Sequence, residues 1–252
     1  ARKALTELTQ GKCNPSEMAA FLTVFIMRSI TVQELLGFRD AMLDLCLRID
    51  LDEYDVMDLC GTGGDGKDTF NISTLSSFIV AGAGQQVAKH GNNGVSSICG
   101  SSNLLAYLGY EFTNDRHKLV EILEKSNICF LHAPLFHPAM KNVASVRKEL
   151  GIKTFFNMLG PMVNPTFLKK QIVGVFNLEL ARLYSYLYQQ TEASYYILHS
   201  LDGYDEVSLT GPFKMIGRNH EGEILPTELG FDYVNPEHLA GGTTVEASAK
   251  IF

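Results

Sequence analysis

The amino-acid sequence predicts an α/β protein: a small all-helical domain and a large α/β domain with a central, mostly parallel sheet flanked by helices. Residues 1 to about 48 have apolar side chains at helical spacing, and short apolar runs alternate with helical stretches beyond them. Such alternation is typical of parallel strands with right-handed crossovers. We expect the helical domain at 1–52, a returning helical segment at about 134–151, and the α/β domain at 53–133 and 152–252.

Two start signals predict helices in the first domain. Asn14-Pro15-Ser16-Glu17 places a proline near the first turn with an acid close behind, and apolar side chains then follow at helical spacing: Met18, Phe21, Leu22, Phe25 and Ile26. Thr31-Val32-Gln33-Glu34 is a Ser/Thr-x-x-Glu box, which typically opens a helix. The first domain should therefore be a packed group of helices.

The second domain contains five short apolar runs that predict strands. They lie at 56–60, 86–89, 128–131, 171–176 and 195–199. Helices are expected from 71 to Gly82 or Gly84, and at about 101–108, about 115–126 and 178–190. The stretch from Ala133 to Gly151 is mostly helical in pattern, and residues 157–165 predict a turn-rich loop.

Composition limits the classes of function. The chain has 252 residues, 46% of them hydrophobic and 19% charged, which is typical of a globular protein. The net charge of −7 disfavours nucleic acid as a partner, because phosphate binding requires a basic surface. No segment has the uncharged length of a membrane span. The five cysteines are scattered and odd in number, which predicts reduced thiols and a cytoplasmic location.

The stretch Cys-Gly-Thr-Gly-Gly-Asp-Gly-Lys-Asp at 60–68 follows the first strand and matches two nucleotide-binding patterns only in its glycines. A dinucleotide fingerprint needs a helix that opens at the third glycine and an acid about 20 residues later. Here the helix is delayed beyond Gly66, and the next strand ends in Lys89-His90. A triphosphate loop needs Ser or Thr after its lysine, where this chain has Asp68. Both patterns are rejected.

A phosphate cradle of a third kind remains, beside the alternative of a turn that binds nothing. Clustered glycines let backbone N–H groups converge on an anion. Asn71-Ile72-Ser73-Thr74 adds side-chain donors and a helix N-terminus, and Lys89 adds a positive charge at the edge where α/β sheets bind ligands. Singly, each feature fits an ordinary turn, helix cap or surface lysine. On consecutive strand ends they favour a ligand with more than one phosphate group.

Six segments, in this order and spacing, resemble the anthranilate phosphoribosyltransferase family over almost the whole chain. They are Gly61–Asp65, Asn71–Thr74, Lys89–Asn92, Ala133-Pro134 with His137–Met140, Val146–Gly151, and Asp205-Glu206. Each motif is weak alone, whereas six in order are specific. The chain looks shortened, because family members have a further helix before Ala1 and further strand and helix after Phe252.

The resemblance implies a transferase. It would move the 5-phosphoribosyl group from 5-phosphoribosyl-1-pyrophosphate (PRPP) to the amine of anthranilate, giving N-(5-phosphoribosyl)anthranilate and pyrophosphate in tryptophan biosynthesis. It implies Mg²⁺ as cofactor, with two ions per site, and a homodimer with the active site between the domains. No residue is assigned as a nucleophile, acid or base, because positioning and charge stabilisation suffice for this reaction.

The resemblance also implies the site residues. PRPP would contact Gly61, Gly63, Gly64, Asp65, Thr69, Asn71, Ile72, Ser73, Thr74, Lys89, Ser97 and Ser101. Anthranilate would contact Gly61, His90, Asn92 and Arg147, with the arginine on its carboxylate. Mg²⁺ would be held by Ser73, Asp205 and Glu206. From the residues alone, the acidic pair and the arginine are better explained as solvated surface groups, and only the resemblance reverses that interpretation.

One departure and two alternatives accompany this interpretation. Asn93 stands where family members often have arginine, which removes a charge beside the PRPP loop. A pyrimidine nucleoside phosphorylase would share the fold but would need no acidic metal pair, so Asp205-Glu206 and Arg147 argue against it. A relative that has lost catalysis and binds nucleic acid would need a basic surface. The net charge of −7 and the intact Asn92/Arg147 pair argue against that alternative.

Overall fold

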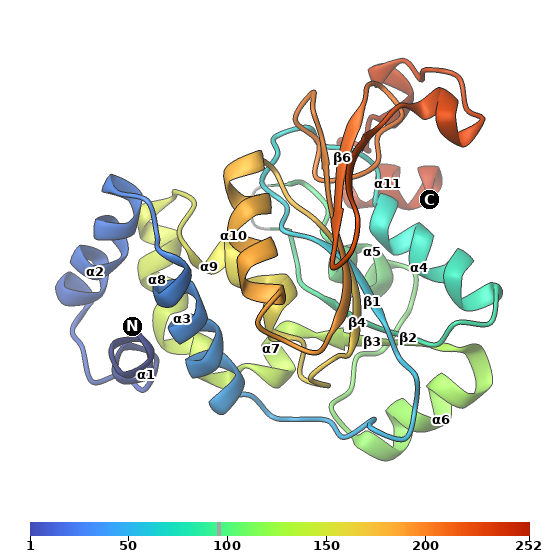
Figure 1. The fold of residues 1–252 in the computed structure, drawn as a ribbon. Coiled ribbons are helices and arrows are strands. Elements are labelled where there is room, and N and C mark those ends of the chain that lie inside the picture. The colour runs from blue at the N-terminus through green and yellow to red at the C-terminus, as the bar shows by residue number, and fades with distance from the viewer. Residues whose placement is uncertain (95–96) are drawn as a thin grey trace.

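A computed structural model describes residues 1–94 and 97–252 (Figure 1). The first helices lie to one side of a body in which a central sheet is covered by helices. The predicted fold class, a small helical domain and a larger α/β domain with a mostly parallel sheet, is therefore confirmed. Within the described part of the chain, no helix has the length and apolar character needed to cross a membrane.

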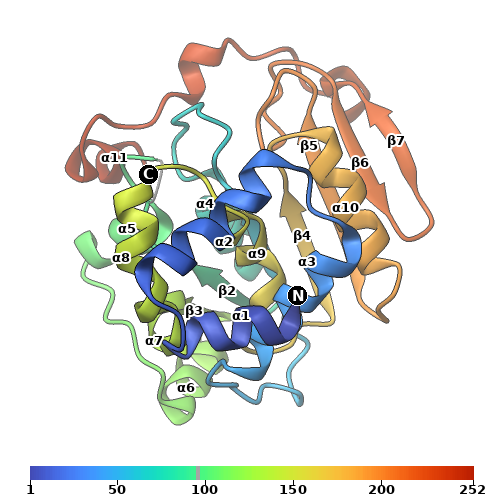
Figure 2. The same ribbon diagram turned by 90° about the vertical axis from the view of Figure 1, so that its left-hand side faces the viewer.

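The helical part joins three N-terminal helices to one later helix. These are α1 (Arg2–Thr9), α2 (Pro15–Met27), α3 (Val32–Asp44) and α8 (Lys141–Leu150). Figure 2 shows that α8 returns to lie beside the first helices, and it contacts α1 and α2. Both predicted start signals form capping boxes. The Glu17 N–H donates to Asn14 Oδ1 at 3.0 Å, and the Asn14 N–H donates back to the Glu17 carboxylate at 2.8 Å. Thr31 and Glu34 form the same pair of hydrogen bonds.

The sheet contains parallel strands at its centre and an antiparallel hairpin at one edge. The strands are β1 (Asp58–Gly61), β2 (Val87–Gly91), β3 (Ile128–His132), β4 (Lys170–Gly174), β5 (Ser194–Ser200), β6 (Phe213–Gly217) and β7 (Glu221–Ile224). Their order is β1-β4-β5-β6-β7, with β2-β3 as a second parallel pair joined to the first sheet by a bridge between Met57 and Val87. Only β5–β6 and β6–β7 pair antiparallel among these strands. The five predicted strands are all present, within about two residues of their expected ends.

Helices fill the crossovers between the strands, as the alternating pattern predicts. They are α4 (Ile72–Gly82), α5 (Ser101–Tyr107), α6 (Arg116–Ser126), α7 (Ala133–Phe136), α9 (Phe156–Leu159), α10 (Leu178–Tyr188) and α11 (Val245–Ile251). Short 3-10 turns complete the chain at η1 (Pro138–Met140), η2 (Gly160–Val163), η3 (Pro226–Leu229) and η4 (Pro236–Leu239). Parallel crossovers of this kind leave the carboxyl ends of β1 and β2 on the same edge.

The expected turn-rich loop at 157–165 is in part helical. The Thr154 N–H donates to Asn157 Oδ1 at 3.1 Å, next to the start of α9, and Pro161 stands in the first turn of η2. A proline there loses no hydrogen bond, since the first N–H groups of a helix have no partner within it. The local signals Gly160-Pro161 and Asn164-Pro165 therefore mark the ends of short turns instead of an irregular loop.

One hydrophobic cluster runs from the helical part to the sheet. Phe38 of α3 stacks on Phe155, which precedes α9, with ring centroids 4.3 Å apart, and Phe21 and Phe25 of α2 pack edge-on against both. The same cluster includes Val173 of β4 and buried side chains of α10. The segment that follows α8 is thus held between helices and sheet, and it faces the ends of the strands.

Candidate active site at the carboxyl ends of the strands

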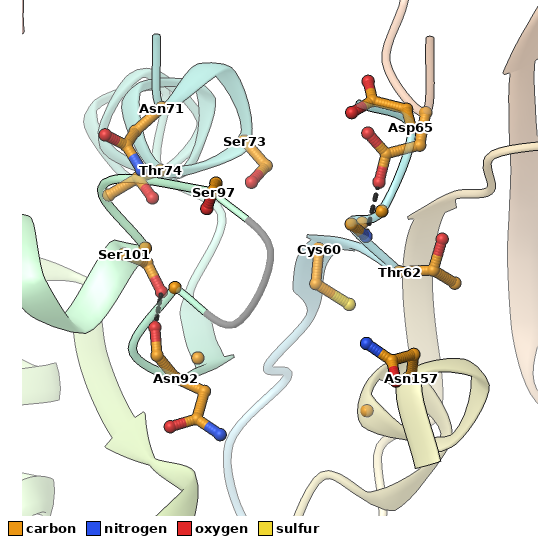
Figure 3. Close-up of a pocket in the computed structure, with 18 of the residues that line it drawn as sticks. Cys60, Thr62, Asp65, Asn71, Ser73, Thr74, Asn92, Ser97, Ser101 and Asn157 are labelled. Atoms are coloured by element: carbon orange, nitrogen blue, oxygen red, sulfur yellow. Dashed lines mark hydrogen bonds between the residues drawn. The ribbon is translucent and has the colours of Figure 1, made fainter. Parts of the chain in front are cut away.

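A cleft of about 310 Å³ opens where β1, β2 and the segment after β5 end. It is lined by every residue that the resemblance assigns to PRPP, anthranilate or Mg²⁺: Gly61, Gly63, Gly64, Asp65, Thr69, Asn71, Ile72, Ser73, Thr74, Lys89, His90, Asn92, Ser97, Ser101, Arg147, Asp205 and Glu206. Figure 3 shows two facing sides. The start of α4, with Asn92, Ser97 and Ser101, lies opposite Cys60, Thr62, Asp65 and Asn157.

The glycine loop after β1, residues 61–66, has the backbone of a cradle. Gly63, Gly64 and Gly66 have φ values of 64°, 82° and 73°, a region that residues with a side chain rarely adopt. The Gly63 N–H donates to Asp205 Oδ2 at 2.6 Å, and both residues line the cleft. A backbone donor of this loop thus binds a carboxylate, which indicates its capacity to bind an anion.

The acidic loop after β5 approaches the strands very closely. Asp205 is buried, and a Cβ atom added to Gly174 of β4 would overlap the Asp205 backbone carbonyl oxygen. Ser200 Oγ donates to the Glu206 carbonyl oxygen at 2.6 Å and so fixes the far end of the loop. Glycine at 174 is therefore what allows the acidic pair to reach the cleft.

The two acids of this loop are enclosed close to other carboxylates, which disfavours their charged forms. Burial raises the pKa of Asp205 to about 7, and the charge of Asp65 adds to the rise. Enclosure by the cleft raises the pKa of Glu206 to about 8, with Asp205 as the next cause. Asp65 Oδ2 is itself buried without a hydrogen-bond partner. A divalent cation would relieve all three carboxylates, because it supplies the opposite charge that burial removes.

These donors fit Mg²⁺ that is bound together with substrate phosphates. Carboxylate and hydroxyl oxygens suit the ion, which normally keeps ligands from water or phosphate beside one or two protein carboxylates. Among residues 1–94 and 97–252, no group of three or more His, Cys, Asp or Glu side chains is arranged to hold a metal ion. Ser73 and the acidic pair would therefore hold the ion together with the ligand.

Lys89 carries a buried positive charge into the middle of the cleft from β2. Its Nζ donates to the Leu59 carbonyl oxygen and lies 3.3 Å from Ser73 Oγ. Asn71 Nδ2 donates to the Cys99 carbonyl oxygen at 3.1 Å, and Thr74 Oγ1 is buried without a partner. The start of α4 is thus held open towards the cleft, with a helix N-terminus and a lysine side by side.

Arg147 reaches the other end of the cleft from the last turn of α8. Its guanidinium carbon lies 5.0 Å from the centroid of the Phe156 ring, and Nη2 donates to Asn157 Oδ1 at 3.5 Å. Burial lowers the pKa of Arg147 from its usual value. No carboxylate is paired with it among the described residues, so a bound carboxylate would complete its hydrogen bonding.

His90 lies beside this arginine end as a neutral ring. Nδ1 lies 3.1 Å from the Gly160 carbonyl oxygen, so this nitrogen carries the proton and donates it. Nε2 is buried and has no partner. Burial lowers the pKa of His90 to about 3, and the neighbouring His137 adds to the effect. The free Nε2 lone pair is an acceptor of a hydrogen bond and a poor base at neutral pH.

Several lining residues were missed by the sequence reasoning. Thr62, Phe156 and Asn157 line the cleft, and Lys153 Nζ donates to the carbonyl oxygen of Gly64. No local pattern singled out Asn157, because the nearby Gly-Pro and Asn-Pro pairs indicated a loop. No local pattern pointed to Lys153.

Two family models match the chain. The model described as the helical bundle domain of a glycosyl transferase family matches residues 1–46, and the a/b domain of that family matches residues 53–252. Anthranilate phosphoribosyltransferase from Flavobacterium johnsoniae is 62% identical over 252 residues, which are all of this chain and 76% of that protein. The Bacteroides fragilis enzyme of the same name is 50% identical over the same span of this chain, again 76% of its own length.

Solved structures agree with these relatives. The crystal structure of the Thermus thermophilus anthranilate phosphoribosyltransferase has a TM-score of 0.91 at 33% identity, covering 99% of this chain and 75% of that one. The Saccharomyces cerevisiae enzyme in complex with PRPP and Mg has a TM-score of 0.89 at 28% identity, covering 98% and 72%. Family models, sequence relatives and folds all lead to one conclusion. The chain belongs to the anthranilate phosphoribosyltransferase family.

Proposed function

We propose that this chain transfers the 5-phosphoribosyl group of PRPP to the amine of anthranilate, releasing pyrophosphate. The observation that carries the proposal is the convergence of the assigned residues on one cleft, with anion donors at one end and Arg147 at the other. A yeast relative is solved with PRPP and Mg, and with 4-fluoroanthranilate. Family membership makes the same reaction the expected one here.

The donor would lie between the glycine loop and the start of α4. Backbone N–H groups of residues 61–66, the side chains of Asn71, Ser73 and Thr74, and the Lys89 ammonium group would hold its phosphates. Mg²⁺, with two ions per site, would neutralise charge that develops on the leaving pyrophosphate. Asp205, Glu206 and Ser73 would hold these ions. The positive charge would offset the burial that raises the pKa of Asp205 and Glu206.

The acceptor would lie between Arg147 and the ribose. Arg147 would hold the carboxylate, Asn92 would border the ring, and His90 Nε2 would accept a hydrogen bond from the amine. The nitrogen lone pair forms the bond to C1, the C1–O bond breaks, and its electron pair leaves with pyrophosphate. The nitrogen then loses one proton to solvent. The chain's residues orient both molecules and exclude water, which accounts for most of the acceleration expected in such a transfer.

The test follows anthranilate fluorescence in the presence of PRPP and Mg²⁺. We expect the signal to fall as product forms, and we expect the double variant Asp205→Asn with Glu206→Gln to lose the magnesium-dependent turnover. No turnover by a folded, full-length protein would contradict the proposal. Cleavage of a pyrimidine nucleoside by inorganic phosphate, with no reaction of anthranilate, would establish the phosphorylase alternative instead.

The proposal extends to assembly and location. Val24, Ile26 and Met27 near the end of α2 are 47%, 42% and 80% exposed, which is unusual for three apolar side chains so close together. This apolar end of α2 supports a homodimer formed through the N-terminal helices. The five cysteines, all at described positions, are free thiols, which supports a reducing, cytoplasmic environment.

A further inference from the structure

Lys153 connects the segment after α8 with the glycine loop. Its Nζ donates to the carbonyl oxygen of Gly64, and its Cε would lie 3.4 Å from a Cβ atom added at Gly64. The same ammonium group lies over the Phe176 ring, 5.8 Å from its centroid. A residue of the Arg147 segment therefore contacts the loop assigned to PRPP.

Asn157 continues this connection to Arg147. The N–H of Thr154, the residue after Lys153, donates to Asn157 Oδ1 at 3.1 Å. The same oxygen accepts a hydrogen bond from Arg147 Nη2 at 3.5 Å, and the neighbouring Phe156 ring lies against the guanidinium. One amide oxygen thus fixes both the backbone beside Lys153 and the orientation of the arginine.

We infer that Lys153 and Asn157 are positioning residues that couple binding of the ribosyl donor to binding of the carboxylate acceptor. This inference rests on the proposed function, since it takes the glycine loop as the donor site and Arg147 as the acceptor site. The glycines at positive φ have no side chains that restrain this loop, so a bound donor can add to its order. A donor that orders this loop also orders Lys153, Thr154, Asn157 and Arg147, so the acceptor binds to an arginine already in place.

The coupling must be reciprocal. If the donor tightens binding of the acceptor by some factor, the acceptor tightens binding of the donor by the same factor. The factor measures the connection itself, because it cancels any effect that a substitution has on either site alone. It therefore separates a positioning role from a general structural role of the 151–157 segment.

The experiment measures this factor without turnover. Benzoate has the ring and carboxylate of anthranilate but no amine, so it occupies the acceptor site and cannot react. Calorimetry gives the dissociation constant of benzoate with and without saturating PRPP and Mg²⁺. We expect at least about 5-fold tighter binding in the wild type, the lower end of typical coupling between sites. Lys153→Met should reduce this ratio below about 2-fold and leave binding of benzoate alone within about 2-fold of the wild type.

Two further variants test the contact and its specificity. Lys153→Arg keeps a donor for the Gly64 carbonyl oxygen and should retain the wild-type ratio. Lys148→Met removes the same charge from an exposed position on α8 and should also retain it. Asn157→Ala should lower the ratio and weaken benzoate alone, because it frees Arg147 as well. A wild-type ratio near 1, or an unchanged ratio in Lys153→Met, would overturn the inference.

This outcome is distinguishable from failure of the proposed function. A folded wild type that does not consume anthranilate with PRPP fails the proposed function, whatever the benzoate ratio is. A wild type that consumes anthranilate while Lys153→Met keeps the full ratio refutes only the coupling.

Discussion

The role of Arg147 is indicated by its surroundings in the structure more than by its position in the sequence. At the end of a helix an arginine is favourable for the helix dipole, which is all that its position in the sequence indicates. In the structure it is half-buried, stacked on Phe156, and shares the oxygen of Asn157 with a backbone N–H. A surface arginine would need none of these contacts, so its place in the cleft supports recognition of a carboxylate.

Removing this guanidinium should weaken binding of anthranilate more than it slows the chemistry. We expect Arg147→Ala to raise the KM for anthranilate by about 10- to 100-fold, the range of a lost charged hydrogen bond, with a smaller change in the KM for PRPP. Arg147→Lys should recover only part of the loss, because an ammonium group lacks the planar fork. Steady-state kinetics with each substrate varied in turn check this. An equal rise in both KM values would contradict the role.

The role of Asn157 could not be predicted from the sequence, in contrast to the capping residues. Capping pairs such as Thr31 with Glu34 lie three residues apart, so spacing alone predicts them, and the structure confirms them. The value of Asn157 depends on Arg147 of another helix and on the backbone beside Lys153. Such a contact is set by packing, and no local spacing records it.

At the scale of elements, the strands and crossover helices were predictable because parallel strands buried on both faces read as short apolar runs. The hairpin of β6 and β7 was not expected, since its strands are only four or five residues long and β7, which has no buried side chain, carries the polar residues of a surface. The 157–165 segment was expected to be a loop because it contains Gly-Pro and Asn-Pro turn signals. Such signals also occur at the ends of short helices.

The junction between the end of β2 and the turn before η1 should weaken in acid. His90 and His137 lie with ring centroids 5.4 Å apart, and burial lowers the pKa of His137 to about 4. A folded-state pKa below the unfolded value of about 6.5 means that the neutral ring stabilises the fold at pH 7. That stability is present above about pH 6.5 and is lost as the pH falls towards 4.

Urea unfolding at pH 7 and pH 5 measures this loss. We expect the urea midpoint of the wild type to be lower at pH 5 than at pH 7. The midpoint of His137→Gln should drop less over the same pH change, because glutamine does not titrate. His90, with a pKa of about 3, keeps part of the slope in the variant. His117→Gln changes an exposed histidine and should keep the full pH dependence. An identical slope in His137→Gln would refute the assignment.

At the scale of the whole molecule, the helical part and the sheet share one core. Side chains of α1, α2 and α3 belong to the same buried cluster as those of β4 and α10, with Phe155 stacked between. The domain boundaries at residue 52 and around the returning segment at 134–151 therefore remain a prediction. A sequence pattern distinguishes helix from strand, but it does not tell how strongly two packed parts resist separation.

The apolar end of α2 supplies the prediction that belongs to this scale. If it forms a dimer interface, Met27→Glu places a charge among buried apolar side chains and should shift the protein towards a monomer. Light scattering after size-exclusion chromatography gives the mass directly. Tyr233→Glu, at an exposed apolar side chain of the C-terminal part, should leave the mass unchanged. A wild-type protein that is monomeric at micromolar concentration would refute the dimer.

Gly174 lies outside the cleft, yet the packing of a cleft residue restricts what can occupy its position. It belongs to β4 and does not line the cleft, yet any larger residue would collide with the backbone of Asp205. Such a change would displace the acidic loop while leaving every ligand-contacting side chain intact. A survey that ranks variants by distance to the substrate would therefore class position 174 as tolerant. An inherited change there would nonetheless act like a change in Asp205 and Glu206, the acids proposed to hold Mg²⁺.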